Sequence, residues 1–325
     1  MKTSMVLPMG RQQRKQQRRT TSNMGAFKMM SHGDLGEGGA RRGRMIAAFV
    51  VGALVLGSAV VARAGRGGSP QAIASAVASG SADAIKAELE RAEYLVCAAC
   101  VPYVLPLIDN DDAGIRQVAA WWLARRGTSR QVFRDMLTRL GQPDSVKARN
   151  AADVLGEFSN PQAIAALGAA LSNPLFDPPA RAAMARALGA IRRPAAALPL
   201  RNALGDGEPV VRAAALSALR QVQVQGGDFR DAAVATPLLG DSDQEVRVQA
   251  IFTVAALRTT TAAAGLVQLL RNDPSAAVRK RAAWALGEIH APVAVAAGAL
   301  GEAASTDSSP VVRSLATAAL GNLSP

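Results

Sequence analysis

The sequence predicts an all-α protein, an α-solenoid of about seven stacked helix pairs behind an N-terminal signal or membrane-anchor helix. Two observations carry this prediction. A twelve-residue repeat motif, called the phrase below, recurs along the chain from residue 115 onward. An uncharged stretch preceded by arginines lies N-terminal to the first copy. A fixed period of roughly 20 to 50 residues is typical of stacked repeats, which bury a continuous core between neighbours.

The first 40 residues form a polar, basic leader without hydrophobic periodicity, and we expect them to be disordered. Residues 1–66 contain twelve Lys and Arg against two acidic residues, a net charge of +10. The whole chain carries +12, so only +2 remains for all residues beyond 66. The repeats therefore have no broad positive field for phosphate backbones, and no nucleic-acid partner is expected.

Residues 41–64 have the pattern of a signal peptide or a membrane anchor. Three arginines within residues 41–44 precede Met45 to Val61, a run without any charge, and the small-residue site Ala62-Arg63-Ala64 follows. Seventeen residues is short for a membrane span, so an uncleaved anchor is the second interpretation. Positively charged flanks of a membrane segment stay on the cytoplasmic side. Both interpretations therefore place the repeats outside the cytoplasm, either in the periplasm or anchored to the inner membrane.

Residues 65–82 are rich in Gly, Ser and Ala, and we expect them to form a flexible linker. The solenoid then occupies residues 83–325 and begins with a helix from Ala82 to about Leu95.

The only two cysteines, Cys97 and Cys100, follow this first helix. Outside the cytoplasm such a pair tends to oxidise, so a local disulfide or two packed thiols is the favoured interpretation. A redox role for a thiol near a helix N-terminus stays open. Val101 stands where a c-type haem motif needs His, and the partners for a four-ligand zinc site are missing.

The recurring phrase predicts the second helix of each pair. Its clearest copy runs from Val278 to Ile289, with apolar residues at the first position and four, five, eight and eleven residues later. This spacing places them on one face of a helix. A glycine often follows the leucine position and is expected to lie near the helix end, where left-handed backbone geometry costs least in glycine. The copies begin at residues 115, 147, 180, 211, 246, 278 and 312, which are 31 to 35 residues apart.

Each phrase is preceded by another apolar segment and then by a short acidic loop. We expect the apolar segment to form the first helix of the pair and the loop to join it to the second helix. An arginine recurs at the second position of the phrase, and we expect it to bridge carboxylates or carbonyls of the adjoining repeat. The loop aspartates are expected to cap helices. The copy that begins Lys147-Ala148 lacks the arginine, so we expect its helix to start late or its contact to be missing. These arginines are Arg116, Arg181, Arg212, Arg247, Arg279 and Arg313, and the aspartates are Asp144, Asp206, Asp241, Asp243, Asp273 and Asp307.

Residues 100–325 resemble HEAT-like repeats, in the short form of phycobilisome-lyase-type proteins. The resemblance implies antiparallel helix pairs in a right-handed superhelix whose second helices line the concave side. It also raises an enzymatic alternative, a lyase or a deoxyhypusine-hydroxylase-like oxidoreductase. Such hydroxylases hold a di-iron centre with several His-Glu pairs, whereas this chain offers one Glu288-Ile289-His290. The lyase resemblance supplies no identifiable catalytic residue, so no cofactor or metal is expected.

The residue six positions after each repeat start lies opposite the apolar core face of the helix and is expected to face the concave surface. The residue two positions after the repeat start is expected to face the same surface. Aromatic and arginine side chains are common anchors of partner binding, with ring packing against neighbouring repeats as the alternative. The predicted function is a non-catalytic cell-envelope scaffold that binds a protein or peptide. Its candidate partner-binding residues are Trp121, Arg186, Phe252, Lys280 and Trp284.

Overall fold

The computed structural model describes residues 68–125, 129–222 and 234–323. All of them belong to the second of two units, residues 62–325. The predicted leader (1–40) and the predicted signal or anchor (41–64) lie outside the described residues. Among the helices that are described, none combines the length and the apolar character that crossing a bilayer requires.

A helical hairpin opens the described part of the chain. Helix α2 (Pro70–Ser79) and helix α3 (Ala82–Arg91) pack on each other, so the linker expected at residues 65–82 is wrong for most of its length. The Ser69 hydroxyl accepts a hydrogen bond from the Ala72 N–H, and Gly80 ends α2 in a left-handed conformation with φ 66°. Alanine is the best helix former, and these two caps define a helix in a composition that we interpreted as flexible.

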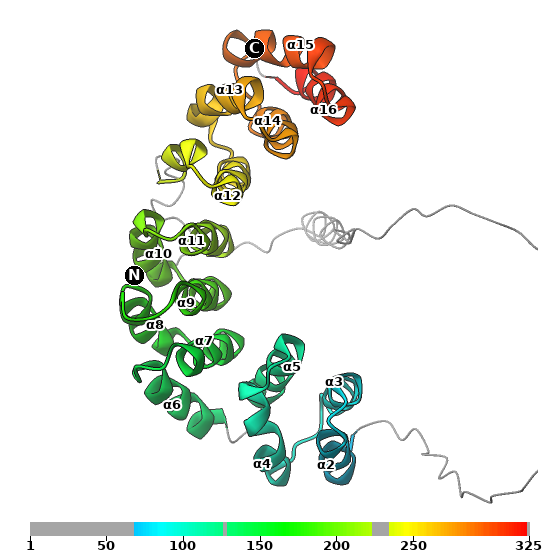
Figure 1. Ribbon diagram of the computed structural model, residues 1–325, viewed down its shortest axis with the longest axis vertical. Coiled ribbons are helices and arrows are strands. Elements are labelled where there is room, and N and C mark those ends of the chain that lie inside the picture. Colours follow the sequence, from blue (N-terminus) through cyan, green and yellow to red (C-terminus); the bar gives the residue numbers. More distant parts are fainter. Residues whose placement is uncertain (1–67, 126–128, 223–233, 324–325) are drawn as a thin grey trace, which may run out of the picture. The chain divides into compact units, whose positions relative to one another are not determined.

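All seven copies of the phrase form helices, and each helix begins two residues before the first position of its copy. Helix α7 starts at the same offset as the others, so the late start expected from Lys147-Ala148 is wrong; the carboxylate of Asp144 caps it through the Lys147 N–H. In Figure 1 these second helices form the inner layer of the stack. They are α5 (Ala113–Ala124), α7 (Ser145–Phe158), α9 (Pro178–Ile191), α11 (Pro209–Gln221), α12 (Gln244–Ala256), α14 (Ala276–Glu288) and α16 (Pro310–Leu320).

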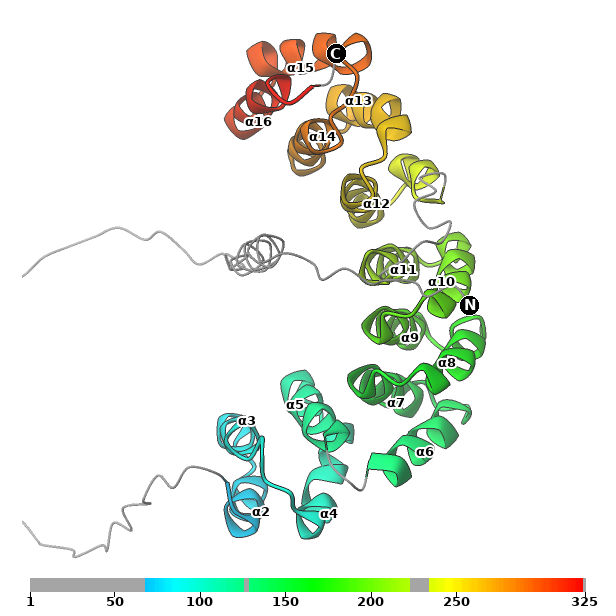
Figure 2. The same ribbon diagram turned by 180° about the vertical axis from the view of Figure 1, so that it is seen from behind.

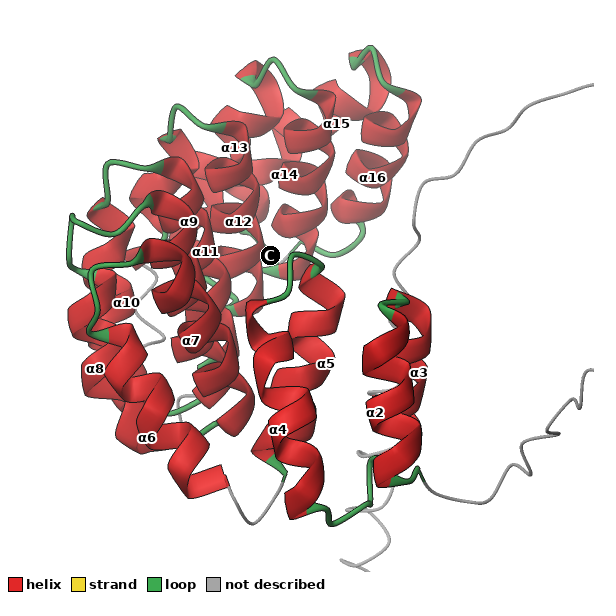
Figure 3. Ribbon diagram, turned by 60° about the horizontal axis from the view of Figure 1, so that its bottom comes forward, coloured by secondary structure: helices red, strands yellow, loops and turns green. Residues whose placement is uncertain are grey.

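The first helices of the pairs form the outer layer, which Figure 2 shows from behind. Short loops join the two layers (Figure 3). In the fifth repeat the described part of this layer is the short segment η8. The outer elements are α4 (Val101–Val104) with η2 (Leu105–Asp109), α6 (Ser129–Leu140), η3 (Pro161–Ala163) with α8 (Ile164–Leu171), η4 (Pro194–Ala196) with α10 (Ala197–Asn202) and η5 (Ala203–Gly205), η8 (Thr236–Gly240), η9 (Thr260–Ala262) with α13 (Ala263–Asn272), and α15 (Val293–Thr306).

The glycine of the phrase serves close packing between repeats. Gly156, Gly189 and Gly287 lie within the last three residues of their helices, near the helix end as expected. A Cβ at Gly189 would lie 2.8 Å from the Cα of Ala218 in the next second helix. Glycine at this position, opposite an alanine, allows the inner helices to approach closely.

The recurring arginines form a ladder along one edge of the stack. The Arg279 side chain donates from Nη1 to the carbonyls of Asp273 and Pro274 in its own loop, and from Nε and Nη2 to the carboxylate of Asp307 in the next loop. This confirms the expected bridging role. The other carboxylate rungs are Arg181–Asp206, Arg212–Asp241 and Arg247–Asp273.

Candidate binding groove

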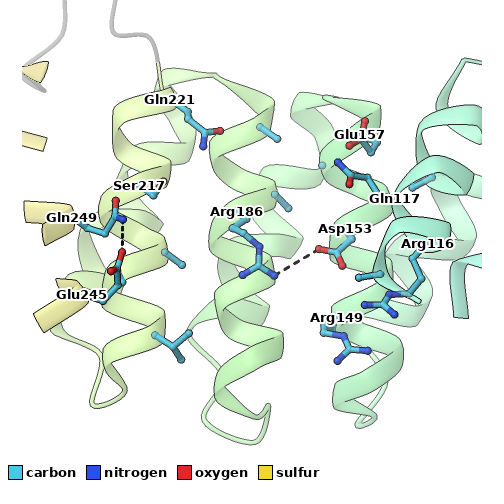
Figure 4. Close-up of a pocket in the computed structure, with 18 residues that line it drawn as sticks. Arg116, Gln117, Arg149, Asp153, Glu157, Arg186, Ser217, Gln221, Glu245 and Gln249 are labelled. Carbon is cyan, nitrogen blue, oxygen red and sulfur yellow. Dashed lines mark hydrogen bonds and ion pairs between the residues drawn. The ribbon is translucent and has the colours of Figure 1, made fainter. Parts of the chain in front are cut away.

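An open groove of about 690 Å³ runs along the inner layer, across α5, α7, α9, α11 and α12. Small side chains form its floor, which lets polar side chains from neighbouring helices project into a shared space (Figure 4). The floor residues include Ala120, Gly156, Ala187, Ala190, Ala213 and Ala214, and the polar lining consists of Arg116, Gln117, Arg149, Asp153, Glu157, Arg186, Ser217, Gln221, Glu245 and Gln249.

Three arginines surround Asp153 in this groove. The Arg186 guanidinium lies 3.9 Å from its carboxylate, and Arg116 and Arg149 also act on it electrostatically. Burial nevertheless raises the pKa of Asp153 above its usual value, because the lost hydration outweighs the attraction of the arginines. Burial likewise raises the pKa of Glu157. Three arginines stand against the two carboxylates of Asp153 and Glu157 here, so this end of the groove carries a positive charge excess.

Two of these arginines lack a carboxylate partner within the described residues. Arg149 donates to the amide oxygen of Asn150, at 3.3 Å from Nε and 3.2 Å from Nη2. Arg116 donates to the carbonyls of Asn110 and Asp111, and its buried Nε has no acceptor. Both guanidiniums keep donor capacity for an incoming group.

The predicted aromatic anchors are partly buried. Phe252 and Trp284 meet edge to face with their ring centroids 5.7 Å apart, and both rings pack against the core of the C-terminal repeats. Trp121 packs against the N-terminal core, with the Arg125 guanidinium 4.5 Å from its ring centre. Neighbouring repeats cover part of each ring, as the packing alternative expects, but none of the three side chains is fully buried.

The structure brings only some of the predicted partner-binding residues together. Arg186 lines the groove, and Trp121 lines an adjoining hollow of about 450 Å³ with Lys86, Glu90 and Glu157. Lys280, Phe252 and Trp284 do not line the groove; they lie farther along the inner layer, on α12 and α14.

Sequence reasoning missed groove residues at three further positions of the repeat. Glu245 precedes the repeat start, Gln249 lies three residues after it, and Glu157 and Gln221 lie ten residues after it. At about 100° per residue these positions lie within roughly 60° of the sixth position on the helix. Including these three positions among those expected to face the concave surface would have identified these residues from the sequence.

Cys97 and Cys100 form a disulfide beside the first repeats. Both residues are buried, and Cys97 immediately precedes η1 (Ala98–Cys100). Near them the Trp122 indole N–H donates to the Ala92 carbonyl, 3.3 Å away, which ties α5 to the end of α3. In the part of the chain that the structure describes, no three His, Cys, Asp or Glu side chains form a group that could hold a metal ion.

Several solved structures are similar to this chain at low identity. The Escherichia coli protein YibA is 18% identical over 74% of this chain and 88% of that chain, with a TM-score of 0.48. Human deoxyhypusine hydroxylase is 20% identical over 78% and 93% of the two chains, with a TM-score of 0.33. The complex of CpcE and CpcF of phycocyanin lyase from Nostoc sp. PCC7120 is 23% identical over 67% and 86%, with a TM-score of 0.38. At these scores none of the three bears on function.

Comparison with curated proteins found no match. The family model for HEAT repeats, in contrast, matches residues 133–220 and 232–321, more than half of the chain. The matched segments include six of the seven predicted copies of the phrase, from the copy at 147 to the copy at 312. This confirms the resemblance that the phrase indicated, and the chain belongs to the HEAT repeat family.

Proposed function

We propose that this protein is a non-catalytic scaffold that binds a protein or peptide partner along the inner face of its repeats. One observation carries the proposal: an open groove of about 690 Å³ collects polar side chains from five successive second helices over a floor of alanine and glycine. Such a groove matches a chain laid across the repeats better than it matches a compact small molecule, because enclosed, mostly apolar pockets are typical of small-molecule sites.

Export or anchoring outside the cytoplasm is part of the same proposal. The Cys97–Cys100 disulfide supports it, because structural disulfides persist in oxidising compartments. Cell fractionation that recovers the protein in the cytoplasm alone would contradict this part. An enzyme of the lyase or hydroxylase kind is the competing function, and iron bound stoichiometrically to the purified protein would favour it.

Site-specific photo-crosslinking tests the binding proposal. A photoreactive residue at Gln221, an exposed position in the groove, is expected to capture a partner protein in cells. The matched control carries the same group at Leu198, which is 66% exposed on α10 of the outer layer. Adding Arg186→Glu is expected to remove the cross-link at 221. Equal capture of a partner protein from positions 221 and 198, or no capture from position 221, would contradict the binding proposal.

A further inference from the structure

Resting on the proposed function, we propose that the partner segment is an extended peptide with two groups of acidic side chains. One group binds the arginines at the α7–α9 end of the groove, and the other binds the cations on α14. The main chain between them lies along the polar middle of the inner face. The charges of the inner layer carry this inference, together with the free donors and acceptors in the groove.

The first cationic cluster consists of Arg116, Arg149 and Arg186, which project into one end of the groove (Figure 4). The Asp153 carboxylate lies 3.9 Å from the Arg186 guanidinium, too far for a close hydrogen-bonded pair. Arg186 is exposed, and within the described residues Arg149 donates hydrogen bonds only to the neutral amide oxygen of Asn150. A carboxylate from a partner can therefore make the charge-assisted hydrogen bonds that Asp153 leaves unmade.

The second cationic cluster consists of Lys280 and Arg281 on α14. Neither has a carboxylate within ion-pair distance in the described ranges of the chain. Arg281 donates to the Ala277 carbonyl at 2.7 Å, and its guanidinium lies 5.6 Å from the Phe252 ring centre. The Phe252 ring beside Arg281 reduces the contact of its guanidinium with water, which strengthens pairing with a partner carboxylate.

Free polar side chains lie in the groove beside the first cluster. Gln117 and Gln221 are exposed there, and neither side chain makes a hydrogen bond to any described residue. Each amide can donate to a carbonyl and accept from an N–H, which is what the main chain of an extended peptide presents. The alanine floor leaves room for that chain to lie close to the helices.

The repeat geometry sets the spacing of the two acidic groups. From α9 to α14 the stack advances three helices, and neighbouring helix axes lie roughly 9 Å apart, so the clusters are separated by about 27 Å. An extended chain covers about 3.3 Å per residue, so the two acidic groups are expected about eight residues apart.

A peptide fits this face better than a nucleic acid does. Asp153, Glu157 and Glu245 lie among the cations in the groove, and they would repel an uninterrupted row of phosphates. Discrete acidic side chains can pair with the two clusters and leave these carboxylates facing neutral residues. The net charge of only +2 beyond residue 66 agrees with this choice.

Fluorescence anisotropy with defined probes tests the proposal. The probe is a labelled Gly/Ser peptide with two Glu pairs about eight residues apart, and its control has Gln in place of every Glu. We expect the Glu peptide to bind the full-length protein at least about tenfold more tightly. The double variants Arg149→Gln/Arg186→Gln and Lys280→Gln/Arg281→Gln are each expected to weaken binding about tenfold. Arg130→Gln/Arg134→Gln on α6, two exposed arginines of the outer layer, is expected to change it less than about twofold.

Each other outcome overturns the inference. Equal binding of the two peptides, or no binding of either, excludes recognition of acidic side chains, and this comparison on the unaltered protein does not depend on how the variants fold. Tighter binding of a single-stranded oligonucleotide of equal charge would assign the face to nucleic acid. Cross-linking at Gln221 without binding of the Glu peptide would refute the acidic chemistry alone, whereas failure of both would refute the proposed function as well.

Discussion

At the residue scale, Asp307 shows how one side chain joins two repeats. Its oxygens accept hydrogen bonds from Arg279 Nε at 2.8 Å and Nη2 at 3.0 Å, and from the Ser309 N–H at 2.8 Å. The side chain is 7% exposed, so water supplies little alternative solvation. The same carboxylate thus holds the preceding repeat and shapes the loop that begins α16.

Asp307→Asn is expected to lower the free energy of unfolding by about 2 kcal/mol at neutral pH, because it removes a charge-assisted pair with a mostly buried arginine. The hydrogen bond from Arg279 holds the pKa of Asp307 below its usual 3.8 in the folded protein. This stabilisation is therefore present above pH 3.8 and is lost as the pH falls toward the lower folded-state pKa. Denaturant titrations of both proteins at pH 7 and near pH 3 measure the difference; a difference that stays constant would contradict the assignment.

At the element scale, the arginine ladder is continuous from α9 to α16 and interrupted before it. The carboxylate of each complete rung lies five residues before a repeat start, as in Asp206 and Asp241. Gln142 and Leu175 occupy the equivalent positions of the second and third repeats, and Ala148 replaces the arginine of α7. The second repeat therefore lacks the arginine–carboxylate contact, as expected. Arg116 of the first repeat also lacks a carboxylate partner in the next loop.

Gln142→Asp is expected to restore the rung to Arg116 and to raise the free energy of unfolding by about 1 kcal/mol. The register supports this, because Arg116 Nη1 already donates to the carbonyls of its own loop, as the ladder arginines do, while its buried Nε has no partner. Gln142 is exposed, so the substitution displaces no core atom. Thermal and denaturant unfolding measure the gain, and Gln142→Asn, which adds no charge, is the control. A variant no more stable than Gln142→Asn would refute the rung.

At the scale of the whole molecule, the phrase predicts the architecture well because each copy imposes the same burial on its helix. The repetition predicts where the second helices lie and which groups the arginines contact. It also indicates the family. The hairpin α2–α3 escaped prediction because it lacks the phrase and depends on the caps at Ser69 and Gly80. The groove was only partly predictable, since its lining depends on which concave side chains neighbouring repeats leave uncovered, as at Trp121 and Gln221.

Two core clusters meet at α11, and Arg220 reinforces this junction. Its guanidinium donates to the Gln249 carbonyl and the Thr253 hydroxyl, both at 3.1 Å, and to the Gln249 amide oxygen at 2.6 Å. Burial lowers the pKa of Arg220 to about 10, so the group remains charged at neutral pH. Helices α11 and α12 pack directly on each other in the inner layer, and within the described residues this contact couples the two clusters.

Arg220→Met is expected to separate the unfolding of the two ends of the stack. The methionine keeps an apolar stem but removes three hydrogen bonds to α12 and leaves the Gln249 amide oxygen without its Arg220 donor, a loss of about 3 kcal/mol concentrated at one interface. Stability in a stacked repeat protein is a sum over neighbouring interfaces, so one weakened junction divides the cooperative unit. Hydrogen exchange is expected to show α12 to α16 losing protection before α5 to α11. Arg271→Met, which removes an exposed pair with Glu302 elsewhere in the stack, is expected to leave unfolding concerted. Concerted exchange of both ends in Arg220→Met would show that Arg220 does not couple them.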